Sequence, residues 1–406
     1  MNCKVSTSDS FFKAAINITG SKSETNRLLL LQALFPSLTI ENISNSDDAG
    51  VMQKGLASNE TVVDIHHAGT AMRFLTAYFA VQEEREVVLT GSSRMKERPI
   101  KILVEALNQL GAQITYEENE GYPPLRISGK QLTKDKVTLP ADVSSQYISA
   151  LLLIAPKLKN GLELTLDGKI TSIPYIQMTL ALLEEIGVKT VFKENVIKVF
   201  PITEEVLPKT LTVESDWSSA SYYYSIVALS KTGSQIELSS YKENSLQGDS
   251  ALATLYKQMG VDTTYKKNSI VLTKVPHEAA SIEFDLTKTP DIAQTIAVTC
   301  FGLQIPCALS GLHTLKIKET DRLEALKTEL TKLGASISVT DKALFLEVSN
   351  TLNSHVAIDT YNDHRMAMAF APLAIKTPII INDAMVVSKS YPDFWEDLKA
   401  LGFEVL

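Results

Sequence analysis

The sequence predicts an α/β fold built from one repeated unit, and three observations support this prediction. A helical apolar stripe, a Gly and an alternating strand-like run recur in that order five times. The five glycines, at positions 111, 187, 260, 334 and 402, are separated by 76, 73, 74 and 68 residues. Several other segments are hydrophobic nearly all round, which is typical of buried helices. Together these features indicate units of about 70 residues, longer than the common solenoid repeats.

Each copy of the repeat should close a helix at its Gly, because Gly adopts the left-handed conformation that ends helices without a steric penalty. The predicted helix ends are 107–111, 183–187, 256–260, 330–334 and 398–402. The segments that alternate as half-buried strands are 112–116, 188–192, 261–265 and 335–339. A turn and a second strand follow the fourth of these at 341–348. A sixth, weaker copy is predicted to end near Gly55.

The helices that cover the sheets should come from the most apolar segments. These are 28–34, 72–80, 148–155, 220–228 and 366–374. Six units could form one large bundle or two lobes of three, and the periodicity is compatible with both. Two lobes would create a cleft, where small ligands prefer to bind.

The composition is that of an ordinary globular protein and disfavours several classes of function. The 406 residues are 45% hydrophobic and suffice for two or three domains. A formal net charge of −8 argues against a nucleic-acid partner. Three Cys without a CxxC spacing support neither a disulfide framework nor a thiolate metal site. With no secretory signal and no apolar run of membrane length, we expect a cytoplasmic protein without a membrane partner.

The first polar cluster, GSKSETNR at 20–27, stands directly before a Leu-rich helical stripe. Serines in this position are typical N-caps, so Lys22, Ser23 and Arg27 should gather near a helix start, where backbone N–H groups favour an anion. Ser23 and Arg27 are four residues apart and should share a helix face. The spacing does not fit a phosphate-binding GxxxxGK[ST] loop. A capped helix with solvated charges is the alternative interpretation.

The second cluster, HHAGTAMRF at 66–74, places Gly69 and Thr70 at a junction between a loop and a helix. Gly in this position allows a ligand to approach the backbone closely. The adjacent His66 and His67 lack the spacing of metal ligands, and no partner residue supplies it, so we expect no metal site.

The third cluster, RMKERP at 94–99, sets Arg94 and Arg98 four residues apart before Pro99. Pro is suited to the first turn of a helix. Two arginines at this spacing can bind a carboxylate or phosphate in bidentate fashion. A solvated basic turn would explain the same residues.

Two later segments add hydroxyl groups at helix entries. DVSSQY at 142–147 opens an apolar helix with Ser144, Ser145 and Gln146. Capping accounts for one Ser, whereas two hydroxyls and an amide together indicate contact with a phosphate or a sugar-like ligand. Ser172 and Tyr175 form a similar entry, an arrangement common enough to carry little weight by itself.

The C-terminal half contributes charged clusters. KETDR at 318–322 should place Lys318 and Arg322 on one helix face with Glu319 beside them, although a structural i,i+4 salt bridge would account for this pattern. Asp291 precedes a mostly apolar run.

YNDHRMAM at 361–368 puts Asp363, His364 and Arg365 directly before an apolar helix, where charges must pair or face a site. Lys389 follows in the segment KSYP. Because an acidic protein concentrates cations at the ends of its elements in this way, the physical inference is a polyanionic small ligand.

These motifs, taken in order, resemble one family closely, the 5-enolpyruvylshikimate-3-phosphate synthases, or 3-phosphoshikimate 1-carboxyvinyltransferases. The match runs nearly end to end and is most specific at KETDR and YNDHRMAM. The resemblance implies a two-lobed inside-out α/β barrel of six βαβαββ repeats, three in each lobe. The first lobe would span 20–214 and the second 1–19 with 215–406, and the active site would lie in the cleft between them.

The resemblance also implies a reaction. The enolpyruvyl (carboxyvinyl) group of phosphoenolpyruvate would move to the 5-hydroxyl of shikimate 3-phosphate, with release of phosphate through a tetrahedral intermediate, in the shikimate pathway to chorismate and the aromatic amino acids. No cofactor or metal is implied, and we expect a monomer.

Particular residues carry this implied reaction. The catalytic residues implied by the resemblance are Asp291, Glu319 and Lys22. Those implied to bind shikimate 3-phosphate are Lys22, Ser23, Arg27, Ser144, Ser145, Gln146, Ser172, Tyr175, Asp291 and Lys318. Those implied to bind phosphoenolpyruvate are Lys22, Gly69, Arg94, Gln146, Arg322, Arg365 and Lys389.

The chain departs from the usual family pattern at a few positions. His66 and His67 stand where Gly-Asn is common, Phe74 where Pro is frequent, and Thr314 where Asn is usual. These departures affect the loop before Gly69 and any expectation about glyphosate sensitivity. Two alternatives stay open, a carboxyvinyltransferase acting on UDP-N-acetylglucosamine, which normally lacks KETDR and YNDHRMAM, and a ligand-binding relative without turnover.

Overall fold

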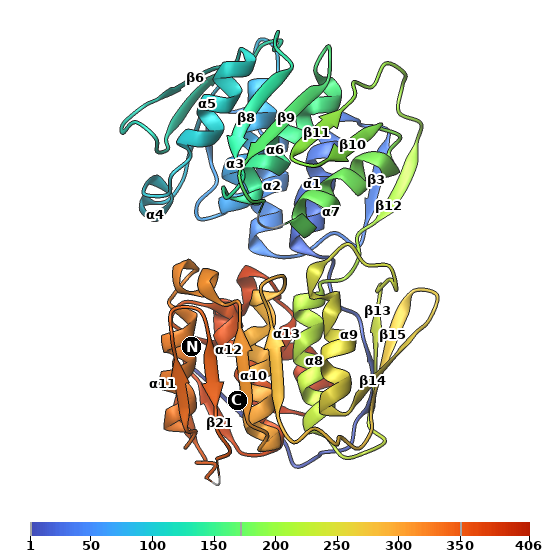
Figure 1. The fold of residues 1–406 in the computed structure, drawn as a ribbon, viewed down its shortest axis with the longest axis vertical. Coiled ribbons are helices and arrows are strands. Elements are labelled where there is room, and N and C mark those ends of the chain that lie inside the picture. The colour runs from blue at the N-terminus through green and yellow to red at the C-terminus, as the bar shows by residue number, and fades with distance from the viewer. Residues whose placement is uncertain (1, 171–172, 350) are drawn as a thin grey trace. The chain divides into compact units, whose positions relative to one another are not determined.

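The computed structural model describes residues 2–170, 173–349 and 351–406. The chain divides into two compact units (Figure 1). The central unit is Ser21–Val213, and the terminal unit combines Met1–Gly20 with Glu214–Leu406. The two chain segments that connect the units meet in the terminal unit, where Gly20 forms an antiparallel bridge with Ser215.

The central unit alternates helices with short strands. Its helices are α1 (Lys22–Leu34), α2 (Asp47–Ala57), α3 (Gly69–Ala80), α4 (Ser93–Lys96), α5 (Lys101–Leu110), α6 (Ser145–Ile154), the 3₁₀ turn η1 (Ala155–Lys157) and α7 (Ile173–Glu185). Its strands are β3 (Leu38–Glu41), β4 (Val62–Asp64), β5 (Glu86–Thr90), β6 (Gln113–Tyr116), β7 (Leu125–Ser128), β8 (Lys136–Pro140), β9 (Leu162–Asp167), β10 (Thr190–Lys193), β11 (Val196–Val199) and β12 (Lys209–Thr212).

The terminal unit has the same alternation. Its helices are α8 (Trp217–Leu229), α9 (Leu252–Leu255), α10 (Ala293–Leu303), α11 (Arg322–Lys332), α12 (His364–Phe370) and α13 (Phe394–Ala400). Its 3₁₀ turns are η2 (Gly248–Ala251), η3 (Tyr256–Met259), η4 (Pro290–Ile292), η5 (His313–Ile317), η6 (Ala371–Ile375) and η7 (Ala384–Lys389). Its strands are β1 (Cys3–Ser6), β2 (Lys13–Ile16), β13 (Gln235–Ser239), β14 (Val261–Tyr265), β15 (Ser269–Lys274), β16 (Ile282–Asp285), β17 (Cys307–Ser310), β18 (Ile337–Val339), β19 (Leu344–Leu346), β20 (Val356–Ile358), β21 (Ile379–Ile381) and β22 (Glu404–Val405).

The sheets confirm that one unit is repeated. Among the described residues, five sheets have four strands, and in each a parallel pair is extended by two antiparallel strands. In the sheet ordered β4-β5-β7-β6, for example, β4 and β5 are parallel and α3 connects them, as a parallel pair requires. The sixth copy of the repeat is reduced, because its described strands, β3 and β12, form only a parallel pair.

The core of each unit consists of helices, and the sheets lie outside them. Twelve of the thirteen residues of α8 are buried, and α10 and α12 are almost as deeply enclosed in the terminal unit. In the central unit α1, α3 and α6 have the same character and pack against one another. The five apolar segments predicted to be buried helices therefore form the centres of the two units (Figure 1).

The repeated glycines close their helices as predicted, with one exception. Gly111, Gly187, Gly260, Gly334 and Gly402 all have positive φ angles, between 76° and 107°. The sixth copy ends near Gly55 as predicted, but Gly55 does not close the helix, because α2 continues through it to Ala57. A Cβ atom on Gly55 would lie 2.4 Å from Leu75 Cδ1, so this Gly permits close packing of α2 on α3.

No helix among the described residues combines the length and the apolar character needed to cross a bilayer.

Two of the repeated glycines in the terminal unit should differ in their tolerance of a side chain. Gly402 faces open space, so Gly402→Ala should cost about 1 kcal/mol of unfolding free energy, from the left-handed backbone alone. At Gly260 a Cβ atom would lie 2.4 Å from the Val275 carbonyl oxygen, so Gly260→Ala should cost roughly 3 kcal/mol. Urea unfolding of both variants measures the difference, and equal losses would contradict the packing argument.

Candidate active site

The start of α1 holds the first predicted cluster. Ser21 occupies the N-cap position without a side-chain capping bond, and Lys22 is the first helical residue. The Lys22 ammonium lies 3.3 Å from Asp48 Oδ2 on α2. Ser23 lies inside the first turn of α1, not at the cap. The uncapped first turn therefore leaves backbone N–H groups available to an anion beside Lys22.

Arg27 is fixed by groups from three helices. Its Nη1 donates to the Ser23 carbonyl at 2.8 Å, which confirms that these two residues share a helix face. Its Nε donates to Thr179 Oγ1 and its Nη2 to Ser149 Oγ, at 2.8 and 2.9 Å. The guanidinium lies 5.8 Å from the centre of the Tyr175 ring, and burial lowers its pKa to about 10. Arg27 thus orders the hydroxyl-rich end of α1 and the half-exposed Tyr175 ring.

The entry of α6 presents the predicted hydroxyls and amide. Ser144 is the N-cap and its Oγ accepts from Gln146 N at 3.4 Å. Ser145 begins the helix. The Gln146 amide donates to Thr70 Oγ1 at 3.1 Å, so this entry adjoins the start of α3.

Arg98 covers Gly69 at the start of α3. A Cβ atom on Gly69 would lie 2.4 Å from Arg98 Nη1 and 2.9 Å from Arg98 Cζ, so the guanidinium in this position packs directly against Gly69. Burial and the nearby Arg73 charge lower the Arg98 pKa, and Asp48 opposes this effect. Within the described residues no hydrogen bond or ion pair involves this guanidinium. Arg98 is therefore a partly buried cation available to a ligand.

Arg94 is placed differently from the prediction. It lies on the single turn α4 with its side chain 82% exposed, and its Nη1 pairs with Glu97 Oε2 at 2.7 Å. Because α4 ends at Lys96, Arg94 and Arg98 do not share a helix face. The expectation for Pro99 was also wrong, since it lies before Ile100, the N-cap of α5. Its carbonyl instead accepts from Tyr147 Oη at 2.7 Å.

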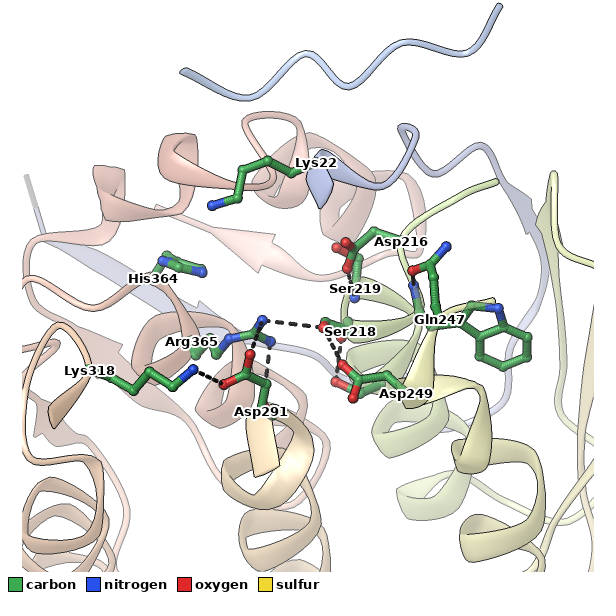
Figure 2. A network of polar contacts seen from close by, with 12 residues as sticks. Lys22, Asp216, Ser218, Ser219, Gln247, Asp249, Asp291, Lys318, His364 and Arg365 are labelled. Atoms are coloured by element: carbon green, nitrogen blue, oxygen red, sulfur yellow. Dashed lines mark hydrogen bonds and ion pairs between the residues drawn. The ribbon is translucent and has the colours of Figure 1, made fainter. Parts of the chain in front are cut away.

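The terminal unit gathers its charges around Asp291 on η4 (Figure 2). Asp291 Oδ1 lies 2.9 Å from Arg322 Nη1 and 3.5 Å from Lys318 Nζ, and its Oδ2 lies 3.5 Å from Arg365 Nη2. Burial raises the pKa of this carboxyl, but the charges of Arg365, Lys318 and Arg322 outweigh it and hold the pKa well below its usual range. Asp291 is therefore ionised at neutral pH.

Arg322 connects Asp291 to two further carboxylates. Its Nε donates to Asp363 Oδ2 at 2.6 Å and its Nη2 to Glu319 Oε2 at 2.9 Å, while the side chain is only 3% exposed. The predicted common helix face of Lys318 and Arg322 was wrong, because α11 begins at Arg322. Lys318 contacts Asp291 from the turn that precedes α11, so Lys318 and Arg322 lie near the same carboxylate without sharing a helix face.

Arg365 is held at the start of α12. Its backbone N–H donates to Asp363 Oδ1, the N-cap of that helix, at 2.9 Å. Its guanidinium donates to the Asp291 carbonyl at 3.3 Å and to Ser218 Oγ at 3.2 Å. The Ser218 hydroxyl in turn donates to Asp249 Oδ2 (Figure 2). Burial, reinforced by the Asp291 charge, raises the pKa of Asp249 to about 6.

Sequence reasoning missed Ser218 and Asp249. The signal available was the helix start at Asp216, which caps α8 through Ser219 N at 2.8 Å. Asp249 lies on the turn η2, which runs directly into α9, and no motif marks it.

Lys389, at the end of η7, donates from its ammonium to the carbonyl and side-chain oxygens of Asn362, at 2.7 and 2.8 Å. It therefore lies against the turn that precedes Asp363.

Metal-type ligands also meet in this cluster. In the part of the chain that the structure describes, Glu319, Asp363 and His364 form a group whose ligand atoms lie within 4.8 Å of one another. Arg322 already binds both carboxylates of this group, so a cation would have to displace a guanidinium. His66 and His67 are exposed and lie outside the group.

The predicted residues thus fall into two clusters. The central cluster contains Lys22, Ser23, Arg27, Gly69, Ser144, Ser145, Gln146 and Tyr175, with Arg98. The terminal cluster contains Asp291, Lys318, Glu319, Arg322, Arg365 and Lys389. The prediction for Ser172 lies outside the described residues.

Comparison with known proteins identifies the family. The family model described as EPSP synthase (3-phosphoshikimate 1-carboxyvinyltransferase) matches residues 38–398. The chain belongs to the EPSP synthase family. It is 47% identical to a 3-phosphoshikimate 1-carboxyvinyltransferase of Bacteroides fragilis, covering 97% of this chain and 96% of that protein. It is 37% identical to a protein of the same name from Vibrio campbellii, with coverage of 95% and 96%.

Solved structures support the EPSP synthase fold. An EPSP synthase from Acinetobacter baumannii superposes with a TM-score of 0.85 at 20% identity, covering 100% of this chain and 99% of that chain. The enolpyruvyl transferase NikO from Streptomyces tendae gives 0.75 at 13% identity, with coverage of 100% and 98%. The chain has the two-lobed inside-out α/β fold of EPSP synthases and is a transferase of the shikimate pathway for aromatic amino acids.

The raised pKa of Asp249 should make its effect on stability depend on pH. The folded protein holds this proton more tightly than the unfolded chain, whose carboxyl has a pKa near 3.8, so the charged carboxyl destabilises the fold progressively as pH rises from 3.8 to about 6. Asp249→Asn removes this titration. Its melting temperature relative to the unsubstituted protein should therefore be higher at about pH 8 than at about pH 4.5.

A matched control for that measurement is Glu243→Gln, which removes an exposed charge from the turn before Asp249. If the difference in melting temperature between Asp249→Asn and the unsubstituted protein stayed constant with pH, the raised pKa of Asp249 would be contradicted.

Proposed function

We propose that this chain transfers the enolpyruvyl group of phosphoenolpyruvate to the 5-hydroxyl of shikimate 3-phosphate and releases phosphate. The observation that carries the proposal is the Asp291 carboxylate, held by three cations with Glu319 on the same arginine. A reaction between two anions needs such cations, and proton transfer to and from carbon and oxygen needs such carboxylates. The transfer involves no net oxidation or reduction, so it requires no redox cofactor.

The central cluster suits the phosphate and hydroxyl groups of shikimate 3-phosphate. The starts of α1 and α6 supply backbone N–H groups together with Lys22, Ser23, Ser144 and Ser145. The half-exposed Tyr175 ring, held over Arg27, offers a face to the shikimate ring. Asp291 and Lys318 of the terminal cluster would contact the hydroxyls of the same substrate.

The remaining cations suit the carboxylate and phosphate groups of phosphoenolpyruvate. Arg322, Arg365 and Lys389 would bind it from the terminal cluster, and Lys22, Gly69 and Gln146 from the central one. We assign the arginine of the RMKERP motif to Arg98 in place of Arg94, because Arg98 covers Gly69 whereas Arg94 is exposed and paired with Glu97. A bidentate guanidinium there matches a phosphate or carboxylate.

The chemistry follows from how the cations are shared. In the free enzyme Arg322 and Arg365 lower the pKa of Asp291. When these arginines turn to the anionic groups of phosphoenolpyruvate, their hold on Asp291 weakens and its basicity rises, so that it can accept the proton of the 5-hydroxyl. The hydroxyl oxygen bonds to C2 while a proton adds to C3, with Glu319 or Lys22 as the donor. Loss of a C3 proton and cleavage of the C2–O bond to phosphate then complete the transfer.

Phosphate release from phosphoenolpyruvate tests the proposal. We expect release with shikimate 3-phosphate and none with UDP-N-acetylglucosamine as the acceptor. Release with the UDP-sugar alone would identify the other carboxyvinyltransferase. No release with either acceptor, despite thermal stabilisation by both ligands, would identify a binding protein without turnover.

The two arginines of the RMKERP motif provide a matched pair of variants. Arg98→Ala should raise the KM for phosphoenolpyruvate about tenfold or more, because a charge-assisted contact is lost. Arg94→Ala should change it less than about twofold, as expected for an exposed ion pair. Steady-state kinetics at saturating shikimate 3-phosphate measures both, and the reverse order would restore the assignment to Arg94.

Glu319→Gln should act mainly on turnover. Removing a proton-transfer group should lower kcat on the order of 100-fold, with little change in either KM. The control is Glu324→Gln, which neutralises an exposed carboxylate in the first turn of α11. If Glu319→Gln turned over at the control's rate with both substrates saturating, Glu319 would have no part in proton transfer.

A further inference from the structure

The turn that precedes α12 has a strained backbone. Tyr361 and Asn362 both have positive φ angles, 52° and 57°, although neither is Gly. Two consecutive left-handed residues of this kind are unfavourable and persist only where their surroundings enforce them. The next residue is Asp363, the N-cap of α12, followed by His364 and Arg365. The strain therefore lies directly before the charged residues of the terminal cluster.

A buried carboxylate holds one side of this turn. Glu329 on α11 has no exposed side-chain surface. Its Oε1 accepts a hydrogen bond from Tyr361 Oη at 2.6 Å, and its Oε2 accepts from Asp359 N at 3.1 Å and from Lys332 Nζ at 2.8 Å. Lys332 also pairs with the Asp359 carboxylate at 2.8 Å. Both Glu329 oxygens are thus used to fix the segment that leads into the turn.

The Tyr361 hydroxyl keeps its proton over the whole working pH range. Burial, the hydrogen bond to Glu329 and the charge of that carboxylate raise its pKa to about 12. The phenol is therefore a permanent donor to Glu329.

Helix α11 holds the segment from 359 to 363 at two points. Arg322, at the first turn of α11, donates to Asp363, and Glu329, seven residues later on the same face, accepts from Tyr361. On the other side of the turn, Lys389 donates to the Asn362 carbonyl and side-chain oxygens. The conformation of Asn362 thus also determines where the Lys389 ammonium lies.

We infer that Glu329 and Tyr361 are positioning residues for phosphoenolpyruvate, because their hydrogen bond holds the left-handed turn that orients Arg365 and Lys389. Neither residue contacts the substrate in this account. The inference rests on the proposed function, in which Arg365 and Lys389 bind phosphoenolpyruvate.

Tyr361→Phe tests the inference with the loss of one hydroxyl. The KM for phosphoenolpyruvate should rise about tenfold, the size expected when a hydrogen bond to a charged group is lost, and the KM for shikimate 3-phosphate should change less than about twofold. Glu329→Gln should also raise the KM for phosphoenolpyruvate, because the amide nitrogen of Gln would face the hydrogen-bond donors of Asp359 and Lys332.

A matched control is Tyr265→Phe, on β14 of the same unit, whose hydroxyl has no hydrogen bond among the described residues. A Tyr361→Phe enzyme that matches this control, or one that loses affinity for both substrates equally, would overturn the inference and leave Tyr361 a purely structural role.

Equilibrium binding separates this inference from the proposed function. If the unsubstituted protein released no phosphate with shikimate 3-phosphate, the proposed function would fail. Calorimetric titration of the same proteins with phosphoenolpyruvate, in the presence of shikimate 3-phosphate, would still measure the effect of the turn. Weaker binding by Tyr361→Phe alone supports the inference, whereas equal binding by all variants, or none by the unsubstituted protein, overturns it.

Discussion

The terminal cluster depends on the buried guanidinium of Arg322. It contacts Asp291 on η4, Glu319 in the preceding turn and Asp363 at the start of α12, so one side chain joins three separate segments. A buried cation is tolerated only when it is paired and hydrogen-bonded, and the carboxylates likewise need the arginine. Asp363 then caps α12 and accepts a hydrogen bond from the Arg365 backbone, while Asp291 forms ion pairs with Lys318 and Arg365. The positions of nearly all the charges in the cluster therefore depend on the ion pairs that Arg322 makes.

The repeated unit explains why site residues far apart in sequence come from equivalent places. In each parallel pair the chain leaves the carboxyl end of a strand and enters a helix or turn, and those ends lie together at one edge of a sheet. In the terminal unit, the residues that follow the parallel strands β13, β16, β17, β20 and β21 are Asp249, Asp291, Arg322, Arg365 and Lys389. In the central unit, those that follow β4, β5, β8 and β9 are Gly69, Arg98, Ser144 and Tyr175. In both units, therefore, the site residues follow the carboxyl ends of parallel strands, in the turns and helix starts that come next.

The sequence was sufficient for the repeat, the buried helices and most of the polar clusters, because helix-ending glycines and apolar stripes are local signals. The resemblance implies Arg94 of the RMKERP motif, and no local signal marks Arg98, because its approach to Gly69 exists only in three dimensions. Asp249 escaped detection because its contacts, through Ser218 to Arg365, join residues distant in the chain. Gly55 was misinterpreted because a Gly that permits helix packing and a Gly that ends a helix look alike in one sequence.

The balance of charge explains why the proposed reaction needs both clusters. The terminal cluster contains four cations, Lys318, Arg322, Arg365 and Lys389, but also four carboxylates, Asp249, Asp291, Glu319 and Asp363. With all of them ionised it has no net positive charge to offer a multiply charged anion. The central cluster adds Lys22, Arg27 and Arg98, with the nearby Arg73, against the carboxylates of Asp48 and Glu24. Its excess of positive charge is what the phosphates of the two substrates require, while the balanced terminal cluster holds its carboxylates ready for proton transfer.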